Sequence, residues 1–209
     1  PDGVVPSREH LYLESGFQPG KYYQVVYATS DAPVAGAGLL AVRDTASFLR
    51  YDGSDDNPTA GRFDRVYGFG VSQTGRMLRE FLYISLNVDE RGRIAHDGLM
   101  PHVAGARRGA FNHRFAQPSN QSYPNFGHRF PFADDSLTDP VTEETGGLLD
   151  RSRATGAMPK VIYTNSSAEY WRGDCALMHV DPLGATDLQP AAETRIYHFA
   201  GTQHGAGNL

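Results

Sequence analysis

The sequence predicts an α/β fold with a mostly parallel sheet, and three observations lead to that prediction. Short strand-like runs alternate with segments of helical period along the first half of the chain. Two more strand-like runs follow after longer connections, which suits parallel strands because a crossover must join them. The length of 209 residues fits one domain of this class. We therefore expect a single domain over residues 1–209, with helices flanking the sheet.

The expected strands are short runs rich in β-branched and aromatic residues. The run at residues 65–70 is apolar and typical of a buried strand, whereas Pro101 weakens the run that follows it. The five expected strands span residues 22–28, 65–70, 98–104, 160–165 and 194–200.

The expected helices lie between the first three strands. Apolar side chains recur at helical period in residues 38–50 and again in residues 74–86. The polar residues 51–61 between these segments are rich in Asp, Asn, Gly and Pro and predict a loop. Residues 107–157 show no clear periodicity.

Composition excludes several classes of function. The formal net charge of −5 gives no electrostatic support for binding nucleic acid or an anionic membrane as the main activity. Cys175 is the only cysteine, so an internal disulfide and a cysteine-based zinc site are excluded. The histidines show no H-E-x-x-H motif, and no metal is expected. No apolar run approaches the roughly 20 residues of a membrane helix. Because the chain begins at Pro1 without Met or a leader, we expect a processed or partial chain. The sequence therefore does not indicate the compartment in which the protein acts.

Residues 67–76 join an expected strand to an expected helix and hold the most informative motif. A phosphate-binding P-loop would need Lys and then Ser or Thr after Gly75, where Arg76 and Met77 stand. A dinucleotide-binding turn would need a third glycine at the position of Gln73. Neither motif fits this turn.

The motif that does fit is the nucleophile elbow Gly-x-Ser-x-Gly, read here as Gly70-Val71-Ser72-Gln73-Thr74. Strand and helix approach closely in this turn, so the residues two before and two after the serine must be small. Gly70 meets that demand fully and Thr74 only tolerably. Ser72 would project above the sheet, and the backbone N–H of Gln73 would face a developing oxyanion. The alternative is a simple turn in which Ser72 caps the helix.

A serine nucleophile needs a histidine base and an acid that orients the histidine. In this class of fold the chain order is serine, acid, histidine. Glu169 follows the fourth expected strand, and His204 lies in a glycine-rich loop after the last one. Since serine, acid and base each follow a separate strand in the expected order, we expect a triad of Ser72, Glu169 and His204.

Other interpretations stay open for each member of the triad. Asp174 or Asp181 could supply the acid in place of Glu169. His198 is a rival base, but it lies inside a strand pattern, where a packed and hydrogen-bonded histidine is expected. Taken alone, His204 would be interpreted as a surface histidine, and only the joint placement favours the triad.

A family resemblance rests on five blocks of sequence, at residues 68–76, 96–109, 111–115, 164–171 and 200–205. On these blocks the chain resembles a family of bacterial α/β-hydrolase-domain proteins, serine hydrolases with a G-x-S-x-T-G elbow. The resemblance covers roughly residues 20–209. It implies the α/β-hydrolase fold, with Ser72 as nucleophile, Glu169 as acid and His204 as base. The resemblance also implies that a threonine in the second glycine position, here Thr74, is typical of this family.

The resemblance also implies a larger parent protein. Residues 20–50 resemble the fourth strand and following helix of the fold, so the third strand and its second oxyanion donor would lie before or around Pro1. Residues 107–157 would then form a cap-like insertion, whose aromatic side chains and arginines suit a polar or aromatic ester. A loop packed by its own aromatic residues is an equally good interpretation.

Three residues are candidates for substrate binding. Trp171 could stack on a ring of the substrate, and Arg107 and His113 could contact its polar groups. The pair Arg107-Arg108 is either solvated or a contact for an acidic substrate.

The sequence therefore predicts a carboxylic ester hydrolase that forms an acyl-enzyme on Ser72 and uses no metal or organic cofactor. Its expected partner is a small-molecule ester. Two alternatives remain, a non-catalytic binding module with the same fold, and an amidase or acyltransferase on the same triad. The acyl group, the alcohol, the oligomeric state and the compartment do not follow from the sequence.

Overall fold

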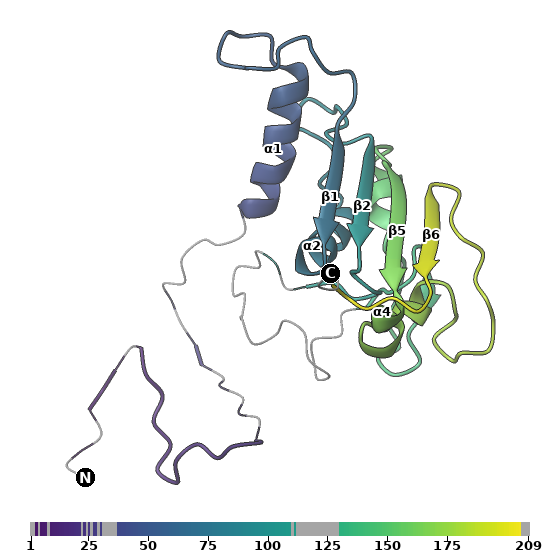
Figure 1. Ribbon diagram of the computed structural model, residues 1–209. Coiled ribbons are helices and arrows are strands. Elements are labelled where there is room, and N and C mark those ends of the chain that lie inside the picture. The colour runs from purple at the N-terminus through teal and green to yellow at the C-terminus, as the bar shows by residue number, and fades with distance from the viewer. Residues whose placement is uncertain are drawn as a thin grey trace. The chain divides into compact units, whose positions relative to one another are not determined.

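A computed structural model describes residues 3, 5–7, 9–21, 23, 25, 27–28, 30, 37–109, 111 and 130–205 (Figure 1). The chain divides into two units, Pro1–Ala32 and Pro33–Leu209. In the first unit the described residues form turns and irregular segments, such as the turn closed by the N–H of Gly16 and the carbonyl of Leu13. The described helices and strands all belong to the second unit.

The second unit contains a parallel sheet of four strands in the order β1-β2-β5-β6. These strands are β1 (Tyr67–Val71), β2 (Gly98–His102), β5 (Lys160–Ser166) and β6 (Thr194–Phe199). Tyr67 pairs with Gly98, and Gly98 pairs with Lys160. Because every neighbouring pair is parallel, the carboxyl ends of all four strands meet at one edge of the sheet.

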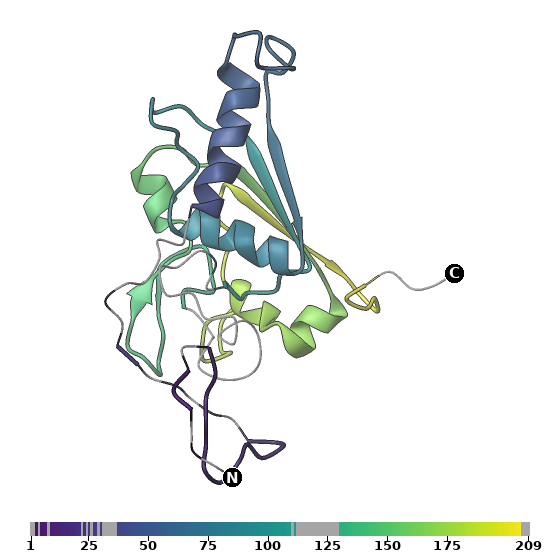
Figure 2. The ribbon, with the colours of Figure 1, turned by 90° about the vertical axis from the view of Figure 1, so that its left-hand side faces the viewer.

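Two helices pack on one side of this sheet. Helix α1 (Gly38–Tyr51) precedes β1, and α2 (Gln73–Tyr83) follows β1 after a single residue. Figure 2 shows both helices on the same side of the strands. Helix α4 (Ser167–Arg172) begins directly after β5, at the carboxyl edge of the sheet. None of the described helices is long and apolar enough to cross a membrane.

Short elements fill the longer connections. Between β2 and β5 lie the antiparallel pair β3 (Leu137–Thr138) and β4 (Thr145–Gly146), followed by α3 (Asp150–Ala154). A 3-10 helix, η2 (Cys175–Met178), lies between α4 and β6.

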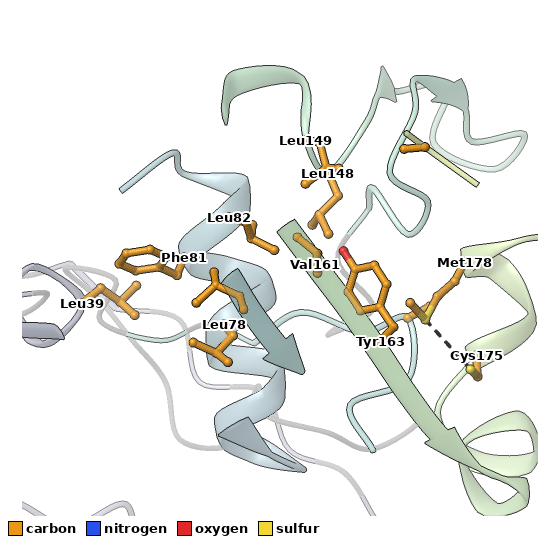
Figure 3. Packing of buried hydrophobic residues seen from close by; sticks show 13 residues of the cluster. Leu39, Leu78, Phe81, Leu82, Leu148, Leu149, Val161, Tyr163, Cys175 and Met178 are labelled. Atoms are coloured by element: carbon orange, nitrogen blue, oxygen red, sulfur yellow. Dashed lines mark hydrogen bonds between the residues drawn. The ribbon is translucent and has the colours of Figure 1, made fainter. Parts of the chain in front are cut away.

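The core contains side chains from α1, α2, β2, β5 and the connection before α3. Figure 3 shows these side chains converging from separate elements. Full burial of one such side chain stabilises the fold by roughly 1.5–3 kcal/mol. The most deeply buried members are Leu39, Leu78, Phe81, Leu82, Leu99, Ala106, Leu148, Leu149, Val161, Tyr163 and Cys175, each at most 3% exposed.

The opposite face of the sheet exposes apolar side chains, which corrects the expectation of a buried strand at residues 65–70. Tyr67 is 69% exposed, Phe69 64% and Val71 44%. Successive side chains of a strand point to opposite faces, and α1 and α2 both lie on the other face. The apolar run therefore gives a strand that is covered on one face.

The other expected elements are largely confirmed. Expected helices at 38–50 and 74–86 correspond to α1 and α2, and the four expected strands after residue 60 correspond to β1, β2, β5 and β6. Pro101 lies within β2 opposite Gly70. Within the expected insertion at 107–157, residues 110 and 112–129 lie outside the described residues.

The expected strand at residues 22–28 is wrong for the residues that are described there. Tyr23, Val25, Tyr27 and Ala28 lie in no strand, and Tyr27 is 75% exposed. A strand needs a neighbour for its backbone N–H and C=O groups, and no described residue pairs with this segment. The other residues of the run lie outside the described part of the chain.

Candidate active site

Ser72 occupies the single position between β1 and α2, in a strained backbone conformation. Its φ is 54° and its ψ is −110°, a region that residues other than glycine rarely adopt. The N–H of Ser72 donates to the carbonyl of His102 at 2.8 Å, which ties the turn to the neighbouring strand. Gln73 begins α2, so its backbone N–H lies at the positive end of the helix dipole.

Gly70 is required by the close approach of strand and helix. A Cβ atom at Gly70 would lie 2.5 Å from the carbonyl oxygen of Thr74 and 2.9 Å from the backbone nitrogen of Gly75. Both neighbours are backbone atoms that cannot move aside as a flexible side chain would. This agrees with the small residue that the sequence motif demands.

Ser72, His204 and Glu169 form a continuous hydrogen-bonded chain. The Nε2 atom of His204 lies 2.8 Å from Oγ of Ser72, and its Nδ1 lies 2.5 Å from Oε1 of Glu169. An ionised carboxylate can only accept, so Nδ1 carries the proton and Nε2 accepts the hydroxyl proton of Ser72. The structure thus brings together the three residues that follow β1, β5 and β6.

Glu169 is held in place by the start of its own helix. Its Oε2 accepts hydrogen bonds from the N–H of Ser166 at 2.7 Å and from the Ser166 hydroxyl at 2.6 Å. The pair is a capping box, in which the Ser166 oxygen also accepts from the N–H of Ala168. The carboxylate therefore has one oxygen fixed to the helix start and the other directed at His204.

The pKa of Glu169 lies below its ordinary value. Burial of the carboxyl group, which is 4% exposed, acts to raise the pKa. The hydrogen bonds from His204 and Ser166 to the charged form outweigh this effect. Glu169 is therefore ionised at neutral pH although it is buried.

The loop with His204 is attached to the start of α4. The hydroxyl of Ser167 accepts from the N–H of Gly201 at 2.9 Å, and the N–H of Ser167 donates to the carbonyl of Thr202 at 3.1 Å. Gly201 adopts a φ of 74°, which turns the chain after β6. The same helix start thus positions both Glu169 and the loop of its partner His204.

The residues that could have taken other roles, as helix cap, acid or base, do not make the contacts with described residues that those roles require. Ser72 stands at the N-cap position but makes no side-chain cap hydrogen bond. Asp174 pairs with Arg107 at 2.6 Å, and Asp181 accepts from backbone N–H groups of its own turn. The Nε2 atom of His198 lies 3.3 Å from the hydroxyl of Ser167.

A cavity of about 400 Å³ opens beside Ser72, and two of the three residues expected to bind substrate line it. Trp171 lines it with an 87% exposed side chain, and Arg107 lines it from the segment after β2. His113 lies outside the described residues. The lining comprises Ser72, Arg76, Val103, Ala104, Arg107, Ala168, Glu169, Trp171, Arg172, Gly173 and His204.

The neighbouring arginines 107 and 108 differ in environment. Arg107 lines the cavity and pairs with Asp174. Arg108 is 5% exposed and pairs with buried Glu80 at 2.6 Å. The expectation that Arg108 is solvated is therefore wrong, because its guanidinium is enclosed beside α2 and has a structural role.

Sequence reasoning missed three polar residues of the site, Arg76, Ser166 and Arg172. Ser166 could have been found, because Ser-x-x-Glu before a helix is the pattern of a capping box. Arg76 follows Ser72 by four residues, which places both on one helix face, but nothing in the sequence shows that a cavity lies there. Among the described residues, no group of three or more His, Cys, Asp or Glu side chains could hold a metal ion.

Comparison with known proteins identifies the family of this fold. The sequence profile of the family described as alpha/beta hydrolase domain matches residues 13–209. No curated protein and no solved structure matches the chain.

Proposed function

The chain belongs to the alpha/beta hydrolase domain family, and from this premise we propose that it is a serine hydrolase that cleaves a carboxylic ester through an acyl-enzyme on Ser72. The hydrogen-bonded chain from Ser72 through His204 to Glu169 is the observation that supports this proposal. A serine hydroxyl is a weak nucleophile at neutral pH unless an adjacent base removes its proton. The 2.8 Å contact with Nε2 of His204 supplies that base.

Acylation begins when Oγ of Ser72 attacks the ester carbonyl carbon while Nε2 of His204 takes the hydroxyl proton. The carbonyl oxygen becomes an oxyanion, to which the N–H of Gln73 is proposed to donate at the positive end of α2. When the C–O bond to the alcohol breaks, His204 gives its proton to the leaving oxygen. The products of this half-reaction are the free alcohol and an acyl ester on Ser72.

Deacylation repeats the sequence with water in place of Ser72. His204 takes a proton from the water as its oxygen attacks the acyl carbon, and the proton then returns to Oγ of Ser72. Glu169 keeps the imidazole in the required tautomer and balances the positive charge that forms on it in both steps. The short contact of 2.5 Å and the low pKa of Glu169 both favour this role.

The proposal is tested by intact-mass labelling with a fluorophosphonate, which traps an activated serine. We expect one adduct on the wild-type chain and none on Ser72→Ala or His204→Ala. Ser54→Ala removes an exposed serine from the loop before β1 and is the matched control, which should be labelled like wild type.

Absence of an adduct on the folded wild-type chain would contradict the proposal and favour a binding module. An adduct that persists in Ser72→Ala would place the reactive serine elsewhere. Hydrolysis of 4-nitrophenyl esters against the matching anilides then separates an esterase from an amidase, and alcohol acceptors reveal acyl transfer.

A further inference from the structure

The cavity beside Ser72 contains a guanidinium group without a carboxylate partner. Arg76 lies one turn after Ser72 on α2, and its backbone N–H donates to the carbonyl of Ser72 at 2.9 Å. Its side chain lines the same cavity, and its Nε atom is buried without a hydrogen-bond partner. No described carboxylate forms an ion pair with it. That atom is shielded from solvent, whereas the two terminal nitrogens of the guanidinium are not among the buried unpaired atoms and are the donors that a partner from solution could reach.

The other charges around the cavity do not neutralise Arg76. Among the described residues of the lining, Glu169 is the only carboxylate, and its two oxygens are occupied by His204 and Ser166. Arg107 has its own partner in Asp174, whereas Arg172 adds a further positive charge to the lining. The balance of charge in the described lining is positive.

The surroundings of Arg76 penalise its charge. Its burial, and next the positive charge of Arg107, lower the pKa of the guanidinium. An arginine nevertheless stays protonated in proteins. A negative group bound beside it would offset the repulsion from Arg107, whereas a neutral ligand would not.

We propose that the ester cleaved at Ser72 carries a carboxylate, which Arg76 binds within the same cavity. The planar guanidinium presents paired N–H donors that match the two oxygens of a carboxylate. The pair forms in a partly enclosed cavity, where charges attract more strongly than in bulk water. The substrate class is then a monoester of a dicarboxylic acid, or an ester with a carboxylate on its alcohol. This inference rests on the proposed function of Ser72.

Two matched pairs of esters test the inference. In the first pair the charge is on the acyl group, with 4-nitrophenyl hydrogen adipate compared with 4-nitrophenyl methyl adipate. In the second it is on the leaving group, with 4-acetoxybenzoate compared with methyl 4-acetoxybenzoate. For each pair we measure kcat/KM at low ionic strength, corrected for spontaneous hydrolysis. We expect the charged member of at least one pair to be preferred by about tenfold or more, as for a hydrogen bond to a charged group.

Variants identify the residue responsible for the preference. Arg76→Gln should bring the ratio of the two kcat/KM values close to one, and Arg76→Lys should restore part of it. Arg62→Gln, in the exposed loop before β1 and thus at the opposite end of that strand from Ser72, changes the net charge equally and should keep the wild-type ratio. Added salt should lower the wild-type ratio, which provides a test that needs no variant.

The outcomes separate this inference from the proposed function. If Ser72 is labelled and esters are hydrolysed with no preference for either charged member, the inference is wrong and the hydrolase proposal stands. A preference that Arg76→Gln retains would also overturn the role of Arg76. If the fluorophosphonate labels nothing and no ester is cleaved, both are wrong.

Discussion

The hydroxyl of Thr74 hydrogen-bonds both backbone groups of Val71, accepting from its N–H at 2.8 Å and donating to its carbonyl at 2.9 Å. These two bonds close the turn that holds Ser72 in its strained conformation. Threonine at this position therefore contributes an interaction that a glycine could not make. Its presence in place of the second glycine of the motif has a physical reason in the backbone of the turn.

Thr74→Val should destabilise the chain by about 1–2 kcal/mol, because it preserves the shape of the side chain and removes both hydrogen bonds. Thr74→Ser restores the hydroxyl and should stay within about 0.5 kcal/mol of wild type. Urea unfolding measures both differences. A Thr74→Val variant as stable as wild type would show that the two bonds contribute nothing net.

Gly70→Ala should cost about 2 kcal/mol or more, because its Cβ would lie 2.5 Å from a backbone oxygen. Gly53→Ala is the matched control, since a Cβ there has nothing within 4 Å, and its effect should stay within about 0.5 kcal/mol. Chemical unfolding measures stability, and fluorophosphonate labelling reports whether the turn still presents Ser72. Equal effects of the two substitutions would contradict the close approach of strand and helix.

Glu169→Gln should lower kcat for ester hydrolysis by about 10⁴-fold with little change in KM. An amide can donate to Nδ1 of His204 and so favours the tautomer that cannot accept the proton of Ser72. Ser166→Ala keeps the carboxylate but removes a 2.6 Å hydrogen bond to it, and a smaller loss of about fivefold is expected. Steady-state kinetics checks both, and a Glu169→Gln enzyme with full kcat would exclude Glu169 as the acid.

Glu169 should also make the stability of the chain depend on pH. Its folded pKa lies below the ordinary glutamate value near 4.5, so the ionised form stabilises the folded state above that value. As the pH falls through the folded pKa, this contribution is lost. We therefore expect the stability of wild type relative to Glu169→Gln to be constant near neutral pH and to decrease below about pH 4.5. Urea unfolding at several pH values measures the difference, and an increase toward low pH would contradict the sign.

The sequence was sufficient for features that depend on local patterns. Helical period identified α1 and α2, and short apolar runs identified the four strands of the sheet. The segment at 22–28 has the same composition but forms no strand at its described residues, because composition does not supply a pairing partner. Ser72, Glu169 and His204 each follow a separate strand, and this order was enough to predict that their side chains lie close together. The reason is that parallel strands have their carboxyl ends at the same edge of the sheet.

Other features were decided by contacts between segments far apart in the sequence. Arg107 and Arg108 are neighbours in the chain, yet one lines a cavity and the other is buried against Glu80 of α2. The exposed face of β1 depends on which side the helices cover, which an apolar run does not show.

By itself, the sequence determined the class of fold, its two main helices and the three residues proposed as a triad, because each of these follows from period, motif or chain order. Only the tertiary structure decided the 2.8 Å and 2.5 Å contacts of His204, the cavity beside Ser72 and the unpaired state of Arg76 within it. The physical reason is that burial and charge pairing depend on every element that packs around a side chain. Local sequence determines only which helix, strand or turn carries the side chain.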